Sequence, residues 1–204
     1  MSAWMVVVAI NPMKLDGPWT AGYVLEKQHT VSSEFLGHDS FGHPQFDSKY
    51  SALGELVYRL KNKGDKNAVD SIADTAVQFI SERWKPEFGL IVPVPPSRRR
   101  EAYRPVIEIA RAIGARLEKP VDPDAVSKVK DTPQLKDVYE FAEREKLLQN
   151  AFKTNGDAVR GKAILLIDDL YRSGATAVVV AQTLLAGGAT HVCMLAVTKT
   201  RTRR

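Results

Sequence analysis

The sequence is poor in cysteine, in aromatic residues and in long apolar runs. Of its 204 residues only Cys193 is a cysteine, and 8% are aromatic. A single cysteine excludes an internal disulfide and any zinc site built from several cysteines. The apolar run near the N-terminus, Trp4–Ile10, has seven residues, whereas a membrane-spanning helix needs roughly 20. Because no basic segment or small-residue cleavage site marks a secretory signal, we expect a cytoplasmic protein without membrane contact.

The composition is that of an ordinary globular protein with an excess of positive charge. Hydrophobic residues make up 44% of the chain and charged residues 26%, which is enough to build a core and a solvated surface. The length fits one α/β domain with a modest elaboration. The net charge of +5 favours an anionic ligand, although charge alone does not distinguish a nucleotide from a nucleic acid.

Short apolar runs alternate with segments of helical spacing over most of the chain. This order predicts an α/β fold with a mostly parallel sheet flanked by helices and right-handed crossovers. We expect helices over about 51–63, 69–80, 105–117 and 177–186, and strands at 90–94, 125–129, 164–167 and 192–197. Alternation in Ala21–Glu26 and in Val31–Phe35 predicts a hairpin or meander. We therefore divide the chain into a β-rich elaboration, 1–50, and a main domain, 51–204.

The segment Ile164–Thr176 carries the clearest chemical signal. Four apolar residues lead directly into Asp168 and Asp169, and a turn containing Gly174 then enters a helix. In a parallel sheet, ligands bind beyond the carboxyl ends of the strands, where we expect both carboxylates to lie. Two such acceptors suit the vicinal hydroxyls of a ribose. The N–H groups of a glycine turn at a helix N-terminus suit a phosphate, and Ser173 and Thr176 add hydroxyl donors.

Three other interpretations of this segment are weaker. A Walker B strand requires a Walker A loop, but the nearest candidate, Gly156–Ala163, lacks a hydroxyl residue after Lys162 and leads into a strand. A dinucleotide fingerprint is absent, because Gly174 stands alone in its turn. Helix capping explains Asp169 or Ser173 singly, but it does not explain the whole ordered segment. A separate segment, the turn-rich stretch Gly37–Pro44, contains His38 and His43. Two histidines in a turn are more often incidental than a metal site.

The segment resembles the 5-phosphoribosyl-1-pyrophosphate (PRPP) motif of type I phosphoribosyltransferases, and the wider pattern resembles the ComF family. Three further stretches occur in that family's order, over about residues 52–198. They are Leu60–Asp65, Val92–Arg100, and the region of Thr132-Pro133-Gln134, Arg144 and Asn150-Ala151-Phe152. Departures are Tyr171 and Arg172 inside the motif, and the lack of the cysteine zinc module with which ComF proteins often begin.

The resemblance implies roles for particular residues. Asp168 and Asp169 would be catalytic and hold the ribose hydroxyls. The PRPP-binding set would be Asp168, Asp169, Leu170, Arg172, Ser173, Gly174, Ala175 and Thr176. The pyrophosphate loop would use Pro95, Ser97, Arg98, Arg99 and Arg100, where arginines after a strand also suit a phosphate clamp on chemical grounds. Residues 132–148 would span a mobile catalytic loop. Mg²⁺ would bind through PRPP, with Asp168 and Asp169 as further ligands.

We therefore expect a phosphoribosyltransferase that transfers the phosphoribosyl group of PRPP to a nitrogen nucleophile, a nucleobase or an amine, and releases pyrophosphate. Its partners would be PRPP, a small-molecule acceptor and a second copy of the chain in a homodimer. The alternative is a non-catalytic PRPP-binding module of the ComF type that acts in DNA uptake or nucleic-acid processing. Pyrophosphate release in the presence of an acceptor distinguishes the two.

Overall fold

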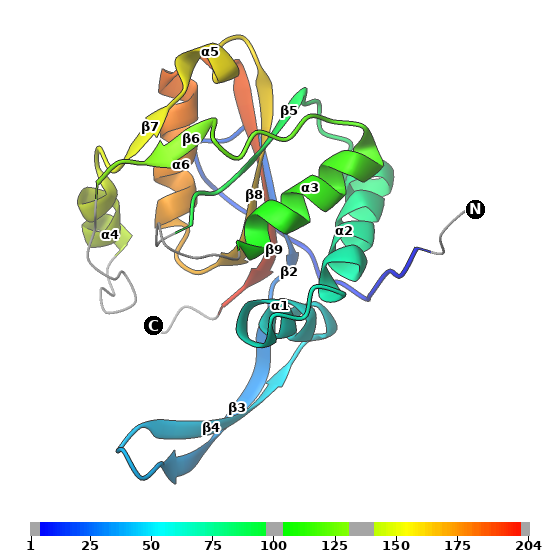
Figure 1. The fold of residues 1–204 in the computed structure, drawn as a ribbon, viewed down its shortest axis with the longest axis vertical. Helices are drawn as coiled ribbons and strands as arrows, with labels where there is room; N and C mark the ends of the chain where they lie inside the picture. The colour runs from blue at the N-terminus through cyan, green and yellow to red at the C-terminus, as the bar shows by residue number, and fades with distance from the viewer. Residues whose placement is uncertain (1–4, 97–103, 131–140, 201–204) are drawn as a thin grey trace.

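The fold was analysed in a computed structural model, which describes residues 5–96, 104–130 and 141–200 (Figure 1). A five-stranded sheet forms its centre, in the order β1-β2-β9-β8-β5. The four strands β2, β9, β8 and β5 are parallel, and only the short edge strand β1 runs antiparallel. Their bounds are β1 Met13–Lys14, β2 Ala21–Glu26, β5 Leu90–Pro93, β8 Ala163–Tyr171 and β9 His191–Lys199. The expected mostly parallel α/β architecture is confirmed.

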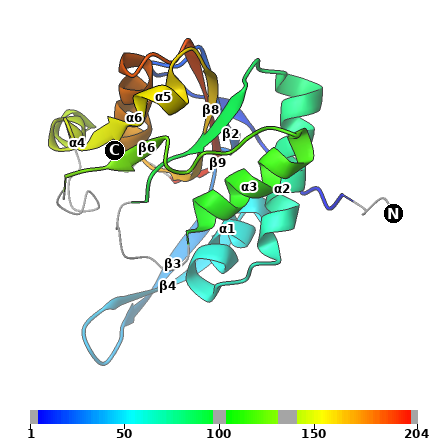
Figure 2. The ribbon, with the colours of Figure 1, turned by 45° about the horizontal axis from the view of Figure 1, so that its top comes forward.

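Helices cover both faces of this sheet (Figure 2). One face packs on α1 (Ala52–Lys63), α2 (Ala68–Gln78) with its π-helical extension η1 (Phe79–Trp84), and α3 (Pro105–Leu117). The other face packs on α6 (Ala175–Ala186), beside which lie α4 (Phe141–Leu148), α5 (Gly156–Val159) and the antiparallel pair β6 (Val126–Lys128) and β7 (Phe152–Thr154). Alternate residues of β8 enter the two cores, Leu166 on the α6 side and Leu165 on the α1 side.

Local signals in the sequence set the ends of several helices. The hydroxyl of Ser51 accepts the backbone N–H of Gly54 and begins α1, and Gly64 ends it at a φ of 66°. Pro105 occupies the first turn of α3. A backbone N–H at this position has no partner within the helix, so the proline costs no hydrogen bond. In the described ranges, no helix is both long and apolar enough to cross a membrane.

The N-terminal hairpin differs from the expected one. Residues 21–26 form β2 of the central sheet and pair in parallel with β9, so they are not part of a hairpin. The hairpin instead joins β3 (Thr30–His38) to β4 (Pro44–Tyr50), which cross-pair from Thr30 and Tyr50 to His38 and Pro44. It projects from the body of the molecule (Figure 1). The division at residue 50 stays a prediction, but the central sheet takes strands from both sides of it.

Gly54 fixes how α1 sits on the chain that leaves β2. A Cβ atom at this position would overlap the carbonyl oxygen of His29 and contact the Ser51 hydroxyl. Gly54→Ala should therefore lower the free energy of unfolding by about 1–3 kcal/mol, as overpacking of a closed site does. Urea unfolding followed by circular dichroism measures this change. Gly89→Ala is the matched control, because a Cβ there meets no atom within 4 Å. An equal effect of the two substitutions contradicts the packing argument.

Candidate functional site

The two adjacent carboxylates lie at the carboxyl half of the central strand β8. Hydrogen bonding between β8 and β9 continues to the pairs Leu170–Thr198 and Tyr171–Lys199, so Asp168 and Asp169 belong to the strand. The expectation that they follow the strand is thus corrected. Successive strand residues point to opposite faces, and the carboxylates consequently lie on either side of β8. Asp169 faces α1, and Asp168 is half-buried on the other side.

Asp169 is held by a lysine from α1. Its Oδ1 atom accepts a hydrogen bond from Nζ of Lys61 at 3.0 Å, and the side chain is only 11% exposed. The backbone carbonyl of Asp169 accepts the hydroxyl of buried Thr198 at 3.4 Å. That hydroxyl also lies 3.0 Å from Nδ1 of His29. The carboxylate therefore stands in a polar cluster that joins α1, β8, β9 and the chain after β2.

His29 connects this cluster to the root of the hairpin. Its ring meets the ring of Tyr50 edge to face, with centroids 5.3 Å apart, and Tyr50 stacks on Tyr58 of α1 at 4.7 Å. Burial lowers the pKa of His29, and the positive charge of Lys61 lowers it further, while Asp169 opposes both. The imidazole is therefore neutral at pH 7, which suits a hydrogen-bonding role with Thr198.

The turn after β8 has the geometry expected of an anion-binding loop. Gly174 has a φ of 85° and precedes the twelve-residue helix α6, so the first-turn N–H groups of that helix point toward the turn. A Cβ on Gly174 would overlap the hydroxyl of buried Tyr171, so this position requires glycine on two counts. The Ser173 hydroxyl accepts the Ala175 N–H at 3.4 Å. Thr176 is half-buried and Arg172 is exposed.

Strand β5 brings a second loop to the same edge of the sheet. Pro93 pairs with Ile167 of β8, and the Val94 N–H donates to the Ile167 carbonyl at 2.8 Å. Pro95, two residues beyond the end of β5, is buried. Ser97, Arg98, Arg99 and Arg100, which we assigned to the pyrophosphate loop, lie outside the described residues. So do residues 132–140 of the expected mobile loop, whereas 141–148 form α4.

The sequence analysis assigned no role to Lys61, His29 or Thr198. Lys61 belongs to the ComF-like stretch Leu60–Asp65. That resemblance did not predict which residue Lys61 contacts. Asp169 and Lys61 are 108 residues apart in the chain, and only the packing of α1 against the sheet brings them together. Within the described ranges, no cluster of three or more His, Cys, Asp and Glu side chains is arranged to hold a metal.

The fold and the motifs define an α/β protein with a mostly parallel sheet that is similar to ComF-like proteins, and comparison with known proteins agrees. The competence protein ComFC of Bacillus subtilis (strain 168) is 28% identical over 143 residues, which cover 67% of this chain and 55% of that protein. The chain thus matches about half the length of this curated relative. The resemblance to ComF-like proteins is confirmed by this match. No known family profile matches the chain.

Three solved structures align with most of this chain, each with a TM-score below 0.5. The glutamine PRPP amidotransferase from B. subtilis, complexed with ADP and GMP, aligns with a TM-score of 0.48 at 15% identity, covering 85% of this chain and 36% of that one. Adenine phosphoribosyltransferase from Thermoanaerobacter pseudethanolicus aligns with a TM-score of 0.45 at 14% identity, covering 81% of this chain and 94% of that one. Adenine phosphoribosyltransferase from Trypanosoma brucei was solved in complex with AMP, pyrophosphate and ribose-5-phosphate. It aligns with a TM-score of 0.47 at 11% identity, covering 93% of this chain and 86% of that one.

Asp168 should make the stability of the protein depend on pH. Burial, and next the charge of Asp169, raise its pKa from 3.8 to about 7, while Lys61 opposes the shift. The folded protein therefore binds a proton more tightly than the unfolded chain, and the free energy of unfolding falls as the pH rises from about 4 to about 7. Asp168→Asn removes this titration and flattens the profile over that range.

Urea unfolding at a series of pH values tests this expectation. Asp157→Asn in α5 is the control, because this carboxylate is exposed and lies outside the site. The control should retain the slope of the unsubstituted protein. A slope in Asp168→Asn equal to that of the control contradicts the assignment of the titration to Asp168.

Proposed function

We propose that this protein is a phosphoribosyltransferase that binds PRPP at the carboxyl edge of β8 and transfers its phosphoribosyl group to a nitrogen nucleophile, with release of pyrophosphate. The observation that carries the proposal is the continuous unit from Asp168 to Ala175. It joins two carboxylates on a central parallel strand to a left-handed glycine at the start of a long helix. The carboxylates match a ribose and the turn matches a phosphate, and the two groups are adjacent in PRPP.

The 5-phosphate would bind at the turn. The backbone N–H groups of Gly174, Ala175 and Thr176 supply donors, and the positive end of the α6 dipole favours a dianion. Ser173 adds a hydroxyl after releasing its contact with the Ala175 N–H. The backbone N–H of Leu170 donates to the Asp168 carboxylate, so Leu170 acts by orienting that acid. Arg172, which is exposed beside the turn, supplies a cation near the phosphate.

The ribose hydroxyls would bind to Asp168 and Asp169 from the end of the strand. Asp169 accepts the hydrogen bond of Lys61, so a hydroxyl that binds this carboxylate shares it with the lysine. The ammonium group then faces the next negative charge of the ligand, which is the pyrophosphate. Because an arrangement of this kind stabilises the leaving pyrophosphate as the bond at C1 breaks, Lys61 would assist transfer as well as binding.

The acidic edge also fits Mg²⁺, which proteins hold with one or two carboxylates and substrate phosphate oxygens. Half-buried Asp168 is the suitable side chain, because it lies beside the β5 loop and carries no lysine at hydrogen-bonding distance among the described contacts. When bound with PRPP, Mg²⁺ would neutralise charge on the pyrophosphate. The carboxylates orient the ribose, and the phosphate turn fixes its other end.

A second candidate is supported by the match to the competence protein ComFC. In this case the site binds PRPP without transfer, and the protein acts in DNA uptake or nucleic-acid processing. The same residues would then form a regulatory binding site. The two candidates agree on the ligand and differ in whether pyrophosphate is released.

Pyrophosphate release decides between them. Purified protein with PRPP and Mg²⁺ should release pyrophosphate when one member of a panel of nucleobases and amines is added, because the acceptor attacks C1. An enzyme-coupled pyrophosphate assay measures this, and Asp169→Asn is the inactive control. Binding of PRPP by calorimetry without release for any acceptor supports the ComF-type module. Absence of binding as well contradicts both candidates.

Lys61 should discriminate between PRPP and ribose-5-phosphate. Lys61→Met removes a charge-assisted contact to the pyrophosphate, worth about 1.5–3 kcal/mol, so the affinity for PRPP should fall about tenfold or more. Ribose-5-phosphate lacks pyrophosphate, so its affinity should fall less than that of PRPP, through the loss of the Lys61–Asp169 ion pair alone. Lys63→Met, two residues further along α1, is the matched control and should bind both ligands normally. Equal losses for the two ligands in Lys61→Met rule out the pyrophosphate contact.

A further inference from the structure

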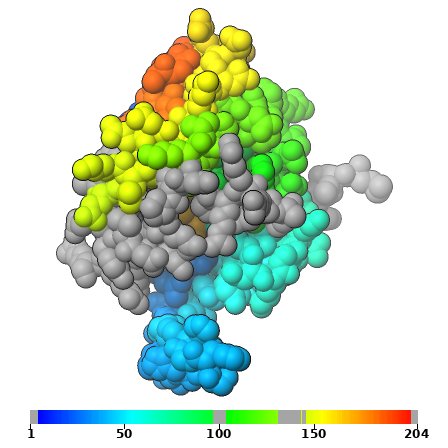
Figure 3. Space-filling model, turned by 60° about the vertical axis from the view of Figure 1, so that its left-hand side comes forward, coloured from blue at the N-terminus to red at the C-terminus, as the bar shows by residue number. Residues whose placement is uncertain are grey.

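The β3–β4 hairpin, residues 30–50, forms an arm that stands away from the body of the molecule (Figures 1 and 3). Within the part of the chain that the structure describes, contacts at its root hold it to the body. The Ser51 N–H donates to the His29 carbonyl at 3.2 Å, and the Tyr50 ring lies between the rings of His29 and Tyr58. The rest of the arm extends into solvent as a two-stranded ribbon. It therefore has a fixed origin and a free outer half.

The outer half of the arm exposes large apolar side chains. Phe41 at the tip is 83% exposed and Leu36 is 65% exposed, while Phe35 and Phe46 are about half exposed and lie against each other with ring centroids 5.5 Å apart. Isolated two-stranded hairpins are at best marginally stable in water. An apolar group of this size on a projecting element marks a surface that another molecule covers. The arm thus needs a partner.

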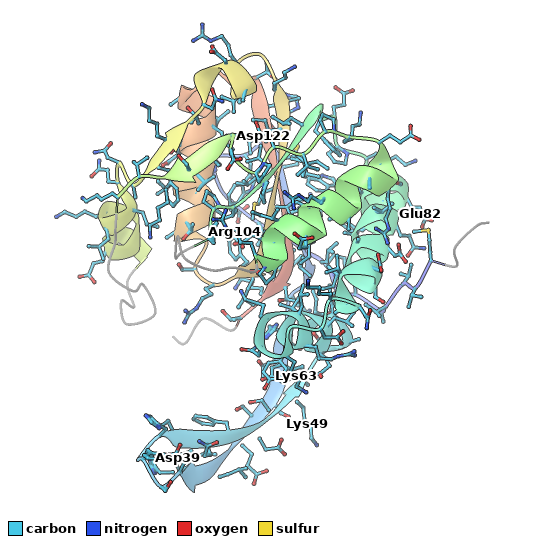
Figure 4. All side chains as sticks on the ribbon, in the orientation of Figure 1. Asp39, Lys49, Lys63, Glu82, Arg104 and Asp122 are labelled. Carbon is cyan, nitrogen blue, oxygen red and sulfur yellow. The ribbon has the colours of Figure 1, made fainter. Side chains whose placement is uncertain are left out.

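The charge of the arm indicates which kind of partner. Residues 30–50 contain Glu34, Asp39 and Asp47 but only Lys49, a net charge of 1 − 3 = −2, so the remainder of the chain carries 28 − 21 = +7. Glu34 and Asp47 are direct cross-strand neighbours, a like-charge pair that destabilises a lone hairpin. Figure 4 labels Asp39 at the tip and Lys49 nearer the root. A basic protein surface relieves this repulsion, whereas a nucleic acid increases it.

We propose that the arm docks on the body of a second copy of this chain, which returns its own arm in a symmetric pair. The body has the positive charge that the arm lacks, and both are present in every copy. A two-fold arrangement covers both apolar tips, and each contact between arm and body occurs twice in the pair. Two arms together bury more surface than one, and a standard interface buries roughly 1,600 Å². This inference does not depend on the proposed catalytic function.

Sedimentation velocity over about a hundredfold range of protein concentration tests the proposal. The unsubstituted protein should be a dimer that dissociates on dilution. Phe41→Ser and Leu36→Ser should each raise the dissociation constant about tenfold or more, because truncation of a central apolar contact has an effect of that size. Ser32→Ala is the matched control, since Ser32 is an exposed, small residue of the same arm near its root, and it should leave the constant unchanged.

A crosslinking experiment avoids dependence on those substitutions. Ser40→Cys places a thiol on the exposed tip of the arm, to which a photoactivated crosslinker is attached. In a mixture of isotopically light and heavy protein, mass spectrometry should find crosslinks from the arm of one copy to body peptides of the other. Three results overturn the proposal: a monomer at every concentration, a dimer that the arm variants leave intact, or crosslinks that form only to an added single-stranded oligonucleotide.

Discussion

The pairing of β8 with β9 is the interaction on which the core and the candidate site both depend. The two strands have nine residues each, lie at the centre of the sheet and pair from Ala163 and His191 to Tyr171 and Lys199. Their inner residues are buried on both faces, and the two hydrophobic cores meet across them. Because this pairing continues past the apolar run that ends at Ile167, it holds two carboxylates in a regular backbone at the edge of the core. The strand thus fixes the positions of Asp168 and Asp169 more precisely than a loop would.

Much of this fold could be predicted because its signals are local. The apolar runs of β5, β8 and β9 and the end signals Ser51, Gly64 and Pro105 are contained in short stretches, and each predicted the element that the structure has. The turn after β8 is equally local, since it depends on one glycine at the start of one helix. The ComF-like resemblance added an order to these segments, and the match to ComFC agrees with it.

The rest required contacts between distant parts of the chain. Residues 21–26 alternate as a hairpin strand does, but their partner is β9, some 170 residues away, because the parallel sheet offers a longer apolar surface. The apolar residues of the short helix α4 stand at its two ends and form no helical spacing in the sequence. Lys61 faces Asp169 only after α1 packs on the sheet. Asp168 and Asp169 lie on opposite faces of the sheet because β8 extends to Tyr171. The apolar run of four residues predicted a shorter strand, which ended before them.

The root of the arm has a consequence for how such proteins can vary. The chain leaves the body at His29 and returns at Ser51, and a hydrogen bond joins these two points. Everything between them is an insertion whose ends are already closed. Since the entropy of closing a loop rises only with the logarithm of its length, doubling such a segment costs about 0.6 kcal/mol. Lineages descended from a common ancestor could therefore lengthen, shorten or replace the insertion at this junction while the sheet and its carboxylates remain as they are.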